Sequence, residues 1–318
     1  MTDVGCAGIL VEDTFCGPMW QCPPEGQLVA VDAMPTKAGG CAANVAIDLA
    51  KQGVRVEIIG CVGRDGAGAV LKDSLEARGV GCRQLIFTEG VATSKTVILL
   101  VEGQDRRYVH FFGANSSFTI KQIPRDWVAG LKVFYLGGLC VMPGLKLAEL
   151  SDLLQFCRSK DVVTVVDVVI PQRFSAAAEL CALLPHIDYF LPNDDEARVL
   201  TGAKDPSAQM RTLLARGANT VIITQGHAGV MAARGEACWR AGTYSASVMD
   251  PSGAGDAFAA GVITGILRGW NVPEMLRYGS ALGASATRAI GTTDGVFTFK
   301  EAESFVKSNP LEIHAGKI

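Results

Sequence analysis

The sequence predicts an α/β fold in which helices cover both faces of a mostly parallel central sheet. Short β-branched runs alternate with helical segments along the chain, as in parallel strands joined by crossover helices. At 318 residues the chain is long enough to bury one large core. Its 49% apolar and 19% charged residues are typical of a folded globular protein and not of a disordered one.

The expected strands are short runs rich in β-branched residues. They lie at residues 4–11, 54–60, 133–136, 162–166, 189–191 and 220–224. The expected helices show helical spacing of apolar residues. They lie at residues 40–52, 66–78, 146–159, 194–201, 207–216, 254–268, 273–288 and 300–308. The first helix carries an apolar stripe of Ala42, Val45, Ala46 and Leu49, and Asn44 lies on its opposite side.

Two segments break this alternation. Residues 94–101 and 106–112 predict a β-hairpin with its turn at 102–105. Residues 19–35 are rich in Pro and Gly and fit no helix. We expect these parts of the chain, about residues 12–38 and 94–117, to form a small sheet beside the main body, where it can cover a ligand.

Charge and cysteine placement exclude several classes of protein. The net charge of −3 offers no basic excess for binding nucleic acid. The longest apolar runs are far shorter than the roughly 20 residues that span a bilayer. No basic region precedes the apolar stretch near the N-terminus, so no secretory signal is predicted. The ten cysteines form no CxxC pair and mostly lie in apolar segments, which favours free thiols in a cytoplasmic protein.

The segment DPSGAGD at residues 250–256 stands directly before an apolar helix of small residues. Gly253, Ala254 and Gly255 leave the backbone N–H groups at this helix start open, and such a start binds phosphate oxygens. Asp256 follows in the first turn, where the helix dipole favours the ionised carboxylate. An anion hole beside a carboxylate suits phosphoryl transfer to a hydroxyl. Taken alone, the string fits a glycine-capped helix equally well.

This segment and the AFAAGVITGIL that follows it resemble the C-terminal signature of the ribokinase-like (PfkB) carbohydrate kinases. Residues 39–80 resemble the N-terminal signature of that family, and the strings at 193–196 and 224–229 follow in the family's order. The resemblance extends from about residue 4 to residue 300. It implies a ribokinase-like three-layer α/β/α fold, one kinase domain over residues 1–318, and a lid formed by the small sheet.

The resemblance also implies roles for individual residues. Asp256 is the expected catalytic base, and Gly253, Ala254 and Gly255 form the expected anion hole for the γ-phosphoryl group of ATP. Substrate hydroxyls are expected at Asp13, Gly39, Gly40 and Asn44. ATP is expected at Thr224, Gly226, Gly229 and Ser280, with Asn193 and Glu196 holding Mg²⁺ and its waters. A monovalent cation such as K⁺ is expected at Asp250, Ser252, Ala286, Ala289 and Gly291.

Some of these residues have simpler interpretations. Asn193 and Glu196 have the spacing of a helix capping box. Thr224 with its glycines fits an ordinary turn after a strand. Asp13 fits a surface acid, and Asn44 fits a solvated helix residue.

The sequence thus indicates an ATP-dependent kinase of a small sugar or related polyhydroxy compound. Val11 stands where ribokinases have a polar sugar contact, and Cys41 replaces the lysine of their GGKGAN string, which argues against ribose. Gly137 and Gly138 stand where ribokinases present an acid to ribose, and they leave room for the base of an adenosine-type nucleoside.

Three arginines are compatible with two different roles. Arg106, Arg107 and Arg173 fit either contacts to an acidic or phosphorylated sugar or solvated loop charges. A non-catalytic sugar-binding relative also fits part of the pattern, although it would not need Asp256 and the glycines before it. Because lids of this family often join two subunits, the resemblance is also compatible with a homodimer formed through the lid.

Overall fold

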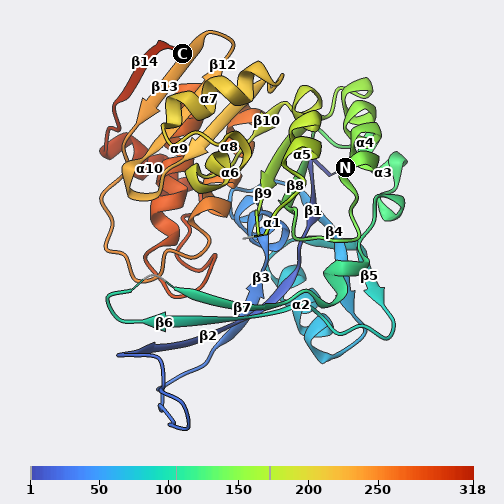
Figure 1. Cartoon of the computed structure of the whole chain (residues 1–318), viewed down its shortest axis with the longest axis vertical. Helices are drawn as coiled ribbons and strands as arrows, with labels where there is room; N and C mark the ends of the chain where they lie inside the picture. Colours follow the sequence, from blue (N-terminus) through green and yellow to red (C-terminus); the bar gives the residue numbers. More distant parts are fainter. Residues whose placement is uncertain (1, 105, 172) are drawn as a thin grey trace.

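The computed structural model describes residues 2–104, 106–171 and 173–318, and over these residues it contains a ten-stranded and a four-stranded sheet (Figure 1). The large sheet has the order β14-β13-β12-β11-β10-β9-β8-β1-β4-β5. Its strands are β1 (Val4–Gly8), β4 (Val56–Gly63), β5 (Gly81–Thr88), β8 (Val133–Leu139), β9 (Val163–Val168), β10 (Tyr189–Phe190), β11 (Thr220–Thr224), β12 (Val230–Arg234), β13 (Ala237–Ala241) and β14 (Ile313–Lys317). The strands from β5 to β11 pair in parallel, and β12, β13 and β14 pair antiparallel.

Helices cover both faces of the large sheet, as predicted. One face carries α3 (Arg125–Ala129), α4 (Leu147–Ser159), α5 (Ala177–Leu183), α6 (Asp194–Thr201) and α7 (Pro206–Ala215). The other carries α1 (Cys41–Lys51), α2 (Gly66–Ala77), α8 (Ala254–Arg268) and α9 (Val272–Ala286), with α10 (Phe299–Ser308) packed outside α9. Short 3₁₀ turns lie at Gly113–Ser117, Ile120–Gln122, Leu184–His186 and Gly226–Ala228. The result is a three-layer α/β/α body.

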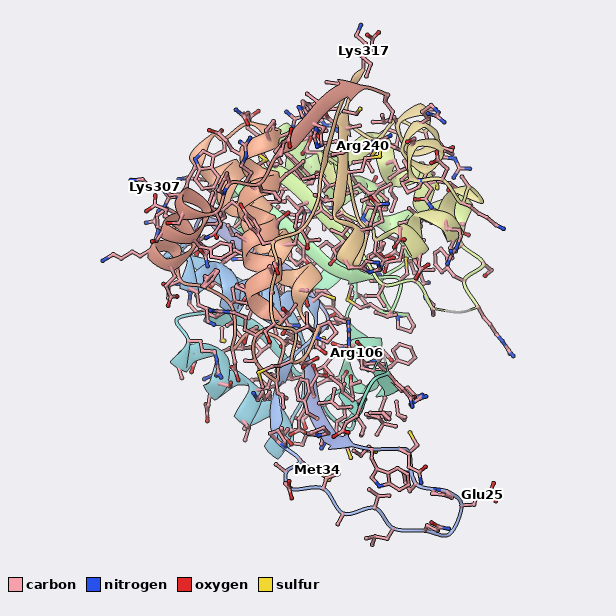
Figure 2. All side chains as sticks on the ribbon, turned by 90° about the vertical axis from the view of Figure 1, so that its left-hand side faces the viewer. Glu25, Met34, Arg106, Arg240, Lys307 and Lys317 are labelled. Carbon is pink, nitrogen blue, oxygen red and sulfur yellow. The ribbon has the colours of Figure 1, made fainter. Side chains whose placement is uncertain are left out.

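The small sheet lies beside this body and has the order β3-β2-β6-β7. It consists of β2 (Val11–Met19), β3 (Thr36–Gly39), β6 (Lys95–Val101) and β7 (Arg107–Phe111). The predicted hairpin is therefore present as β6 and β7, while Asp105 of its predicted turn lies outside the described residues. The segment between β2 and β3 extends away from the body as a loop that includes Glu25 and Met34 (Figures 1 and 2).

The prediction of one strand over residues 4–11 is wrong. The first strand ends at Gly8, and the chain enters the small sheet at Val11. Between them, Leu10 donates its backbone N–H to Asn115 Oδ1 (3.1 Å), and Asn115 Nδ2 donates to the Leu10 carbonyl (3.0 Å). Because a side-chain amide takes the place of a strand partner here, the chain can leave one sheet for the other without losing backbone hydrogen bonds.

Other elements were missed from the sequence, namely β5, β12, β13, β14, α3 and α5. The antiparallel end of the large sheet was therefore not foreseen, although the sheet is mostly parallel as predicted. None of the described helices is long and apolar enough to cross a membrane.

Candidate active site

A cleft of about 170 Å³ lies where the carboxyl ends of β9 and β11 meet the start of α8. Parallel α/β sheets bind ligands at this edge. Its wall includes Asp167, Asn193, Glu196, Thr224, Gly253, Ala254, Gly255 and Asp256. Arg106, from the loop that leads into β7, also lines the cleft and lies at the junction of the small sheet and the body (Figure 2).

The turn before α8 exposes backbone N–H groups to this cleft. Gly253 has a φ of 79°, and a side chain there would collide with the backbone of Thr292. Gly255 is exposed, and a side chain there would meet nothing within 4 Å. Among the described residues no side chain caps the helix at Gly253. The Ala254 N–H donates to the Pro251 carbonyl over 3.4 Å, which leaves the neighbouring N–H groups of Gly253 and Gly255 available to an anion.

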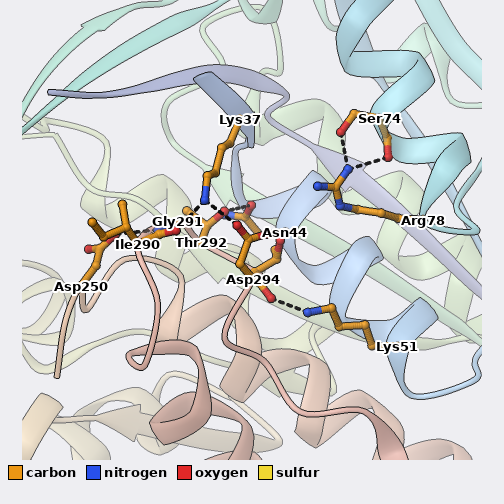
Figure 3. Close-up of polar contacts among 11 residues, drawn as sticks. Lys37, Asn44, Lys51, Ser74, Arg78, Asp250, Ile290, Gly291, Thr292 and Asp294 are labelled. Atoms are coloured by element: carbon orange, nitrogen blue, oxygen red, sulfur yellow. Dashed lines mark hydrogen bonds and ion pairs between the residues drawn. The ribbon is translucent and has the colours of Figure 1, made fainter. Parts of the chain in front are cut away.

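Asp256 is held by Asn44, which is itself oriented by Thr292 from another distant part of the chain. Asn44 Nδ2 donates to Asp256 Oδ2 (2.8 Å), and Thr292 Oγ1 donates to Asn44 Oδ1 (2.7 Å). The second bond fixes the orientation of the Asn44 amide, so its NH₂ group faces the carboxylate; Figure 3 shows Asn44 beside Thr292. Asn44 is 3% exposed, and the interpretation of a solvated helix residue is wrong.

Burial raises the pKa of Asp256 to about 6, against the hydrogen bonds from Asn44 and Cys41, which lower it. The carboxylate is thus ionised at neutral pH and still more basic than an ordinary aspartate. A group with a pKa close to the working pH is well suited to accept a proton during a reaction.

Asp167 also lines the cleft, but it was not among the site residues predicted from the sequence. It stands near the end of β9, and Tyr135 Oη donates to its Oδ2 (3.2 Å). Burial, with the charges of Glu196 and Asp256, raises the pKa of Asp167 well above its usual value. The ligand atoms of Asp167, Asp256 and Cys41 lie within 4.8 Å of one another. Asp167 could have been recognised in the sequence as an acid at the carboxyl end of an apolar strand.

Asn193 and Glu196 form the capping box of α6, as their spacing suggested. Glu196 N donates to Asn193 Oδ1 and Asn193 N donates to Glu196 Oε2, both over 2.8 Å. Both residues nevertheless line the cleft. Burial raises the pKa of Glu196 to about 7, although backbone N–H groups donate to it. The cap therefore positions a carboxylate at the cleft.

The residues predicted to bind substrate also gather near this edge. Asp13 is 6% exposed, so it is not the surface acid of the simpler interpretation. A side chain at Gly39 would collide with the Asp13 carboxylate, and one at Gly40, whose φ is 90°, would come within 2.5 Å of the Ile9 carbonyl. Burial raises the pKa of Asp13 to about 7, and the charge of Asp256 contributes.

Of the four residues predicted to contact ATP, one lines the cleft. Thr224 ends β11, pairs with Asn193 through an isolated bridge and lines the cleft. Gly226 and Gly229 have positive φ, and a side chain at Gly229 would collide with the Ala241 carbonyl. Ser280 lies on α9 and is not among the residues that line the cleft.

Two of the predicted cation residues, Ser252 and Gly291, contact Asp250 directly. Asp250 is fully buried, and it accepts hydrogen bonds from the N–H groups of Ser252 (2.9 Å) and Gly291 (3.0 Å). The buried Ser252 hydroxyl has no hydrogen-bond partner within the described residues. Ala286 and Ala289 lie in the segment that leads to Gly291. An unpaired buried hydroxyl is an oxygen ligand that a cation could use.

Lys37 joins the small sheet to the same loop. Its Nζ donates to the Ile290 carbonyl (2.6 Å) and pairs with the Asp294 carboxylate (Figure 3). Of the three arginines considered from the sequence, Arg106 lines the cleft, while Arg107 is exposed and donates to Gln104. Arg173 is also exposed.

Comparison with known proteins supports a common ancestry with sugar kinases. Residues 1–298 match the family described as pfkB family carbohydrate kinase. The chain is 24% identical over 259 residues to the ATP-dependent 6-phosphofructokinase of Thermoanaerobacterium thermosaccharolyticum, covering 80% of each protein. It is 28% identical over 298 residues to the 2-dehydro-3-deoxygluconokinase of Bacillus subtilis, covering 89% of this chain and 90% of the relative.

A similar solved structure is that of an E. coli protein, provisionally identified as ribokinase II, in complex with ATP and Mg²⁺. The TM-score is 0.84 at 20% identity, over 97% of this chain and 100% of the other. At that identity the likeness concerns the fold.

Proposed function

This chain belongs to the pfkB family of carbohydrate kinases, and we propose that it transfers the γ-phosphoryl group of ATP to a hydroxyl of a small sugar with Asp256 as the base. Membership makes the enzyme a phosphotransferase that acts on a sugar hydroxyl. The observation that carries the finer proposal is the meeting of the Asp256 carboxylate and the open N–H groups of α8 in one cleft.

In this mechanism, Asp256 accepts the proton of the attacking hydroxyl. Asn44 keeps the carboxylate in place through the 2.8 Å hydrogen bond. The N–H groups of residues 253–255 stabilise the negative charge on the moving phosphoryl group. Closure of the small sheet, as a lid, excludes water that would otherwise accept the phosphoryl group.

Glu196 and Asp167 are the residues that would hold Mg²⁺, with Asn193 beside them. Their carboxylates line the cleft, and hard oxygen ligands suit this ion. When bound, Mg²⁺ neutralises charge on the phosphates of ATP. Burial raises the pKa of both carboxylates, and neighbouring acids add to it: Glu196 and Asp256 for Asp167, and Asp195 and Asp194 for Glu196. A cation bound here would compensate this buried negative charge.

For ATP we propose contacts at Thr224, Gly226 and Gly229, with Ser280 nearer the adenine. For the monovalent cation, such as K⁺, we propose Asp250 and Ser252 with the backbone of Ala286, Ala289 and Gly291. The unpaired Ser252 hydroxyl and the buried Asp250 carboxylate supply hard oxygens there. These oxygens fit a monovalent cation, which would stiffen the loop beside the anion hole.

The sugar is proposed to bind at Asp13, Gly39, Gly40 and Asn44. Gly39 supports this assignment, because any side chain there would displace the Asp13 carboxylate. Arg106 lines the cleft that contains Asp256 and could pair with an acidic group of the sugar or with a phosphate of ATP. Small sugars with and without an acidic group are therefore the substrates to test.

The nucleoside alternative loses its main support. The space beside Gly137 is filled by Tyr135 and Cys41, and the space beside Gly138 is filled by Ile9. These glycines thus accommodate protein side chains and do not open room for a base. A non-catalytic binding protein is disfavoured too, because Asp256 is held with a raised pKa at the cleft.

A panel of acceptors tests the proposal directly. ADP formation is measured with Mg·ATP and D-ribose, D-fructose, fructose 6-phosphate, 2-dehydro-3-deoxygluconate or adenosine. We expect turnover that depends on a sugar or sugar acid and exceeds the rate with water alone. Turnover with adenosine only, or no acceptor-dependent turnover across a wider sugar panel, would contradict it.

We also propose that the lid joins two copies of the chain. One face of its β6–β7 pair exposes Val97, Val109 and Phe111, with exposed fractions from 36% to 64%. An apolar patch of this kind is typical of an interaction surface. Sedimentation velocity should show a dimer that Val109→Asp dissociates, and a monomeric wild type at micromolar concentration would overturn the idea.

A reducing, cytoplasmic location is the remaining proposal. Each of the ten cysteines, all within the described residues, is free. A chain with this many free cysteines is typical of a reducing compartment, where disulfides do not form. Immunoblotting of separated cell fractions under the native promoter would check the location.

A further inference from the structure

Three side chains that can bind a metal ion lie together at the cleft. The Cys41 Sγ and one carboxylate oxygen from each of Asp167 and Asp256 lie within 4.8 Å of one another. Each side chain comes from a different element: Cys41 begins α1, Asp167 stands near the end of β9, and Asp256 lies in the first turn of α8. Because Asp167 and Asp256 line the cleft, an ion can reach them from solvent.

A glycine on β8 leaves the space that this cluster occupies. A Cβ at Gly137 would lie 2.9 Å from the Cβ of Cys41 and 2.7 Å from the Tyr135 hydroxyl. That hydroxyl donates to Asp167 Oδ2 over 3.2 Å. The absence of a side chain at Gly137 therefore lets Cys41 and the Tyr135–Asp167 pair approach one another.

Neither carboxylate of the cluster is paired with a basic side chain. Asp167 accepts its hydrogen bond from Tyr135 and Asp256 accepts one from Asn44, and both donors are neutral. In the part of the chain that the structure describes, none of the ion pairs involves Asp167 or Asp256. Charges withdrawn from water in proteins are usually paired or coordinate metals. A bound cation would supply the positive charge that these two acids lack.

The donor atoms favour zinc over magnesium. One sulfur and two carboxylate oxygens are ligands that Zn²⁺ takes, often with three protein ligands and one open position. Mg²⁺ prefers an octahedron of oxygen atoms and is not held by thiolates. With Zn–S bonds of about 2.3 Å and Zn–O bonds of about 2.0–2.2 Å, two ligand atoms on a tetrahedral ion stand roughly 3.5 Å apart. Ligand atoms that already lie within 4.8 Å of one another reach that spacing by small side-chain rotations.

We propose that Cys41, Asp167 and Asp256 form an inhibitory site for a thiophilic divalent cation, with Zn²⁺ as the expected ion. On binding, the Cys41 thiol releases its proton to solvent, Sγ bonds to the ion, and each carboxylate supplies one oxygen. The ion then occupies the carboxylate that accepts the hydroxyl proton in the proposed mechanism, and it takes Asp167 away from Mg²⁺. The inhibition rests on the proposed function, whereas binding of the ion does not.

Cobalt binding tests the site without a kinase assay. Co²⁺ binds the ligands that zinc prefers, and a thiolate bound to it gives a charge-transfer band in the near ultraviolet. Fully reduced enzyme without nucleotide or sugar is titrated with Co²⁺. We expect this band in the wild type and its loss in Cys41→Ser. The matched control is Cys22→Ser, at a partly buried cysteine of the loop between β2 and β3, which should keep the band.

A second variant tests whether the carboxylates take part. Asp167→Asn should keep the thiolate band and weaken the Co²⁺ affinity at least about tenfold, since even the partners behind a metal ligand are worth roughly 10–100-fold in affinity. An unchanged affinity in Asp167→Asn would contradict the site. The absence of any band that depends on Cys41 would overturn it as well.

Inhibition is measured with Mg·ATP and the acceptor of fastest turnover, with free Zn²⁺ fixed by a metal buffer. Micromolar Zn²⁺ should inhibit the wild type, and enough EDTA to bind all of the zinc should restore the rate, as it would not for an oxidised thiol. In Cys41→Ser, the Zn²⁺ concentration that halves the variant's own rate should rise at least about tenfold. Cys22→Ser should have the sensitivity of the wild type. Equal sensitivity of Cys41→Ser and the wild type would show that Zn²⁺ acts elsewhere.

The two measurements separate this proposal from the proposed function. If the cobalt band depends on Cys41 but no sugar is phosphorylated, the proposed function fails and the metal site stands. If a sugar is phosphorylated but neither the cobalt band nor the zinc sensitivity depends on Cys41, the kinase stands and the metal site is wrong.

Discussion

The start of α8 and the loop that leads into β7 of the small sheet line one cleft, yet the residues of the helix start and of the sheet are held very differently. Around α8, Asp250 and Asn44 are 0% and 3% exposed and are fixed by hydrogen bonds from separate parts of the chain. In the small sheet, every residue of β7 is exposed. The phosphoryl-transfer end is therefore built on buried elements, whereas the edge strand β7 of the covering sheet is only lightly packed.

This difference suits the two tasks. Phosphoryl transfer depends on positions held to within a fraction of an ångström. A lid has to open and close on each cycle, so its contacts must be weak enough to break. We expect substitutions near α8 to change turnover strongly and substitutions in the small sheet to change mainly affinity. Variants in each region test that division.

The largest effect is expected from Asp256→Asn. An amide cannot accept the hydroxyl proton, so kcat should fall about 10²–10⁴-fold. The KM for ATP should change little, because the N–H groups of the turn remain. A coupled assay for ADP and a thermal melt of the same protein provide the measurement. The matched control is Asp152→Asn, at an exposed acid on α4, and a folded Asp256→Asn enzyme with near-normal turnover would remove this residue from the mechanism.

A pair of glycine substitutions separates the fold of the turn from its chemistry. Gly253→Ala puts a side chain at a φ of 79° against Thr292, so the free energy of unfolding should drop by at least about 1–2 kcal/mol. Gly255→Ala meets no neighbour within 4 Å and should leave stability unchanged or raise it, since alanine favours the helix. Its methyl group would nevertheless stand at the anion hole, so kcat should fall about tenfold or more.

Urea unfolding and kcat are measured for both variants. Wild-type turnover in Gly255→Ala would argue against the anion hole. Equal loss of stability in the two variants would show that the turn does not have the described backbone.

The turn before α8 could be predicted because its chemistry is local in sequence. The glycines, the helix start and Asp256 stand side by side, and no distant contact is needed to recognise them. Asp167 was missed because its partners, Tyr135 and Glu196, come from other elements of the fold. Asn44 was open to a solvated interpretation for the same reason, since Thr292 follows it by 248 residues.

The fold shows the same limit. Continuous β-branched runs indicated the parallel strands, because strands buried on both faces need such runs. The residues 4–11 form one apolar run, and nothing in that run marks the transfer at Leu10, which depends on the amide of Asn115. The strand β14 escaped notice because four of its five residues are exposed. The end of the first strand thus depends on a contact between residues far apart in the sequence, which the local pattern of residues does not show.

The pH dependence of kcat and of stability should reflect the raised pKa of Asp256. Asp256 must be ionised to accept a proton, and its pKa is about 6, so kcat should fall about tenfold for each pH unit below that value. The same acid affects stability with a defined sign. Its pKa is higher in the folded than in the unfolded chain, so the folded state binds more protons between about pH 4 and 6, and stability falls as pH rises through this window.

Initial rates and melting temperatures from pH 4.5 to 8 check both statements. Asp256→Asn should lose less stability than the wild type as pH rises. A larger loss in the variant would contradict the assigned pKa.

A smaller effect is expected from Thr292→Val. Without the hydroxyl donor, the Asn44 amide can rotate away from Asp256, and kcat should fall by up to about tenfold, the worth of roughly one hydrogen bond. Thr292→Ser keeps the donor and should retain turnover. A loss in Thr292→Ser as large as in Thr292→Val would show that packing at this position, and not the hydrogen bond, supports the base.

The smallest effect is expected where the two regions meet, at Lys37→Met. Lys37 belongs to the small sheet but bonds to Ile290 and Asp294 in the loop beside α8. Since partly exposed ion pairs contribute only about 0.2–1 kcal/mol, the KM for ATP should rise no more than about fivefold while kcat is kept. The control is Lys95→Met, which breaks the Lys95–Glu12 pair of the same sheet without touching that loop. A fall in kcat of a hundredfold would mean that the lid sheet takes part in the chemistry, and the division between the two regions would have to be abandoned.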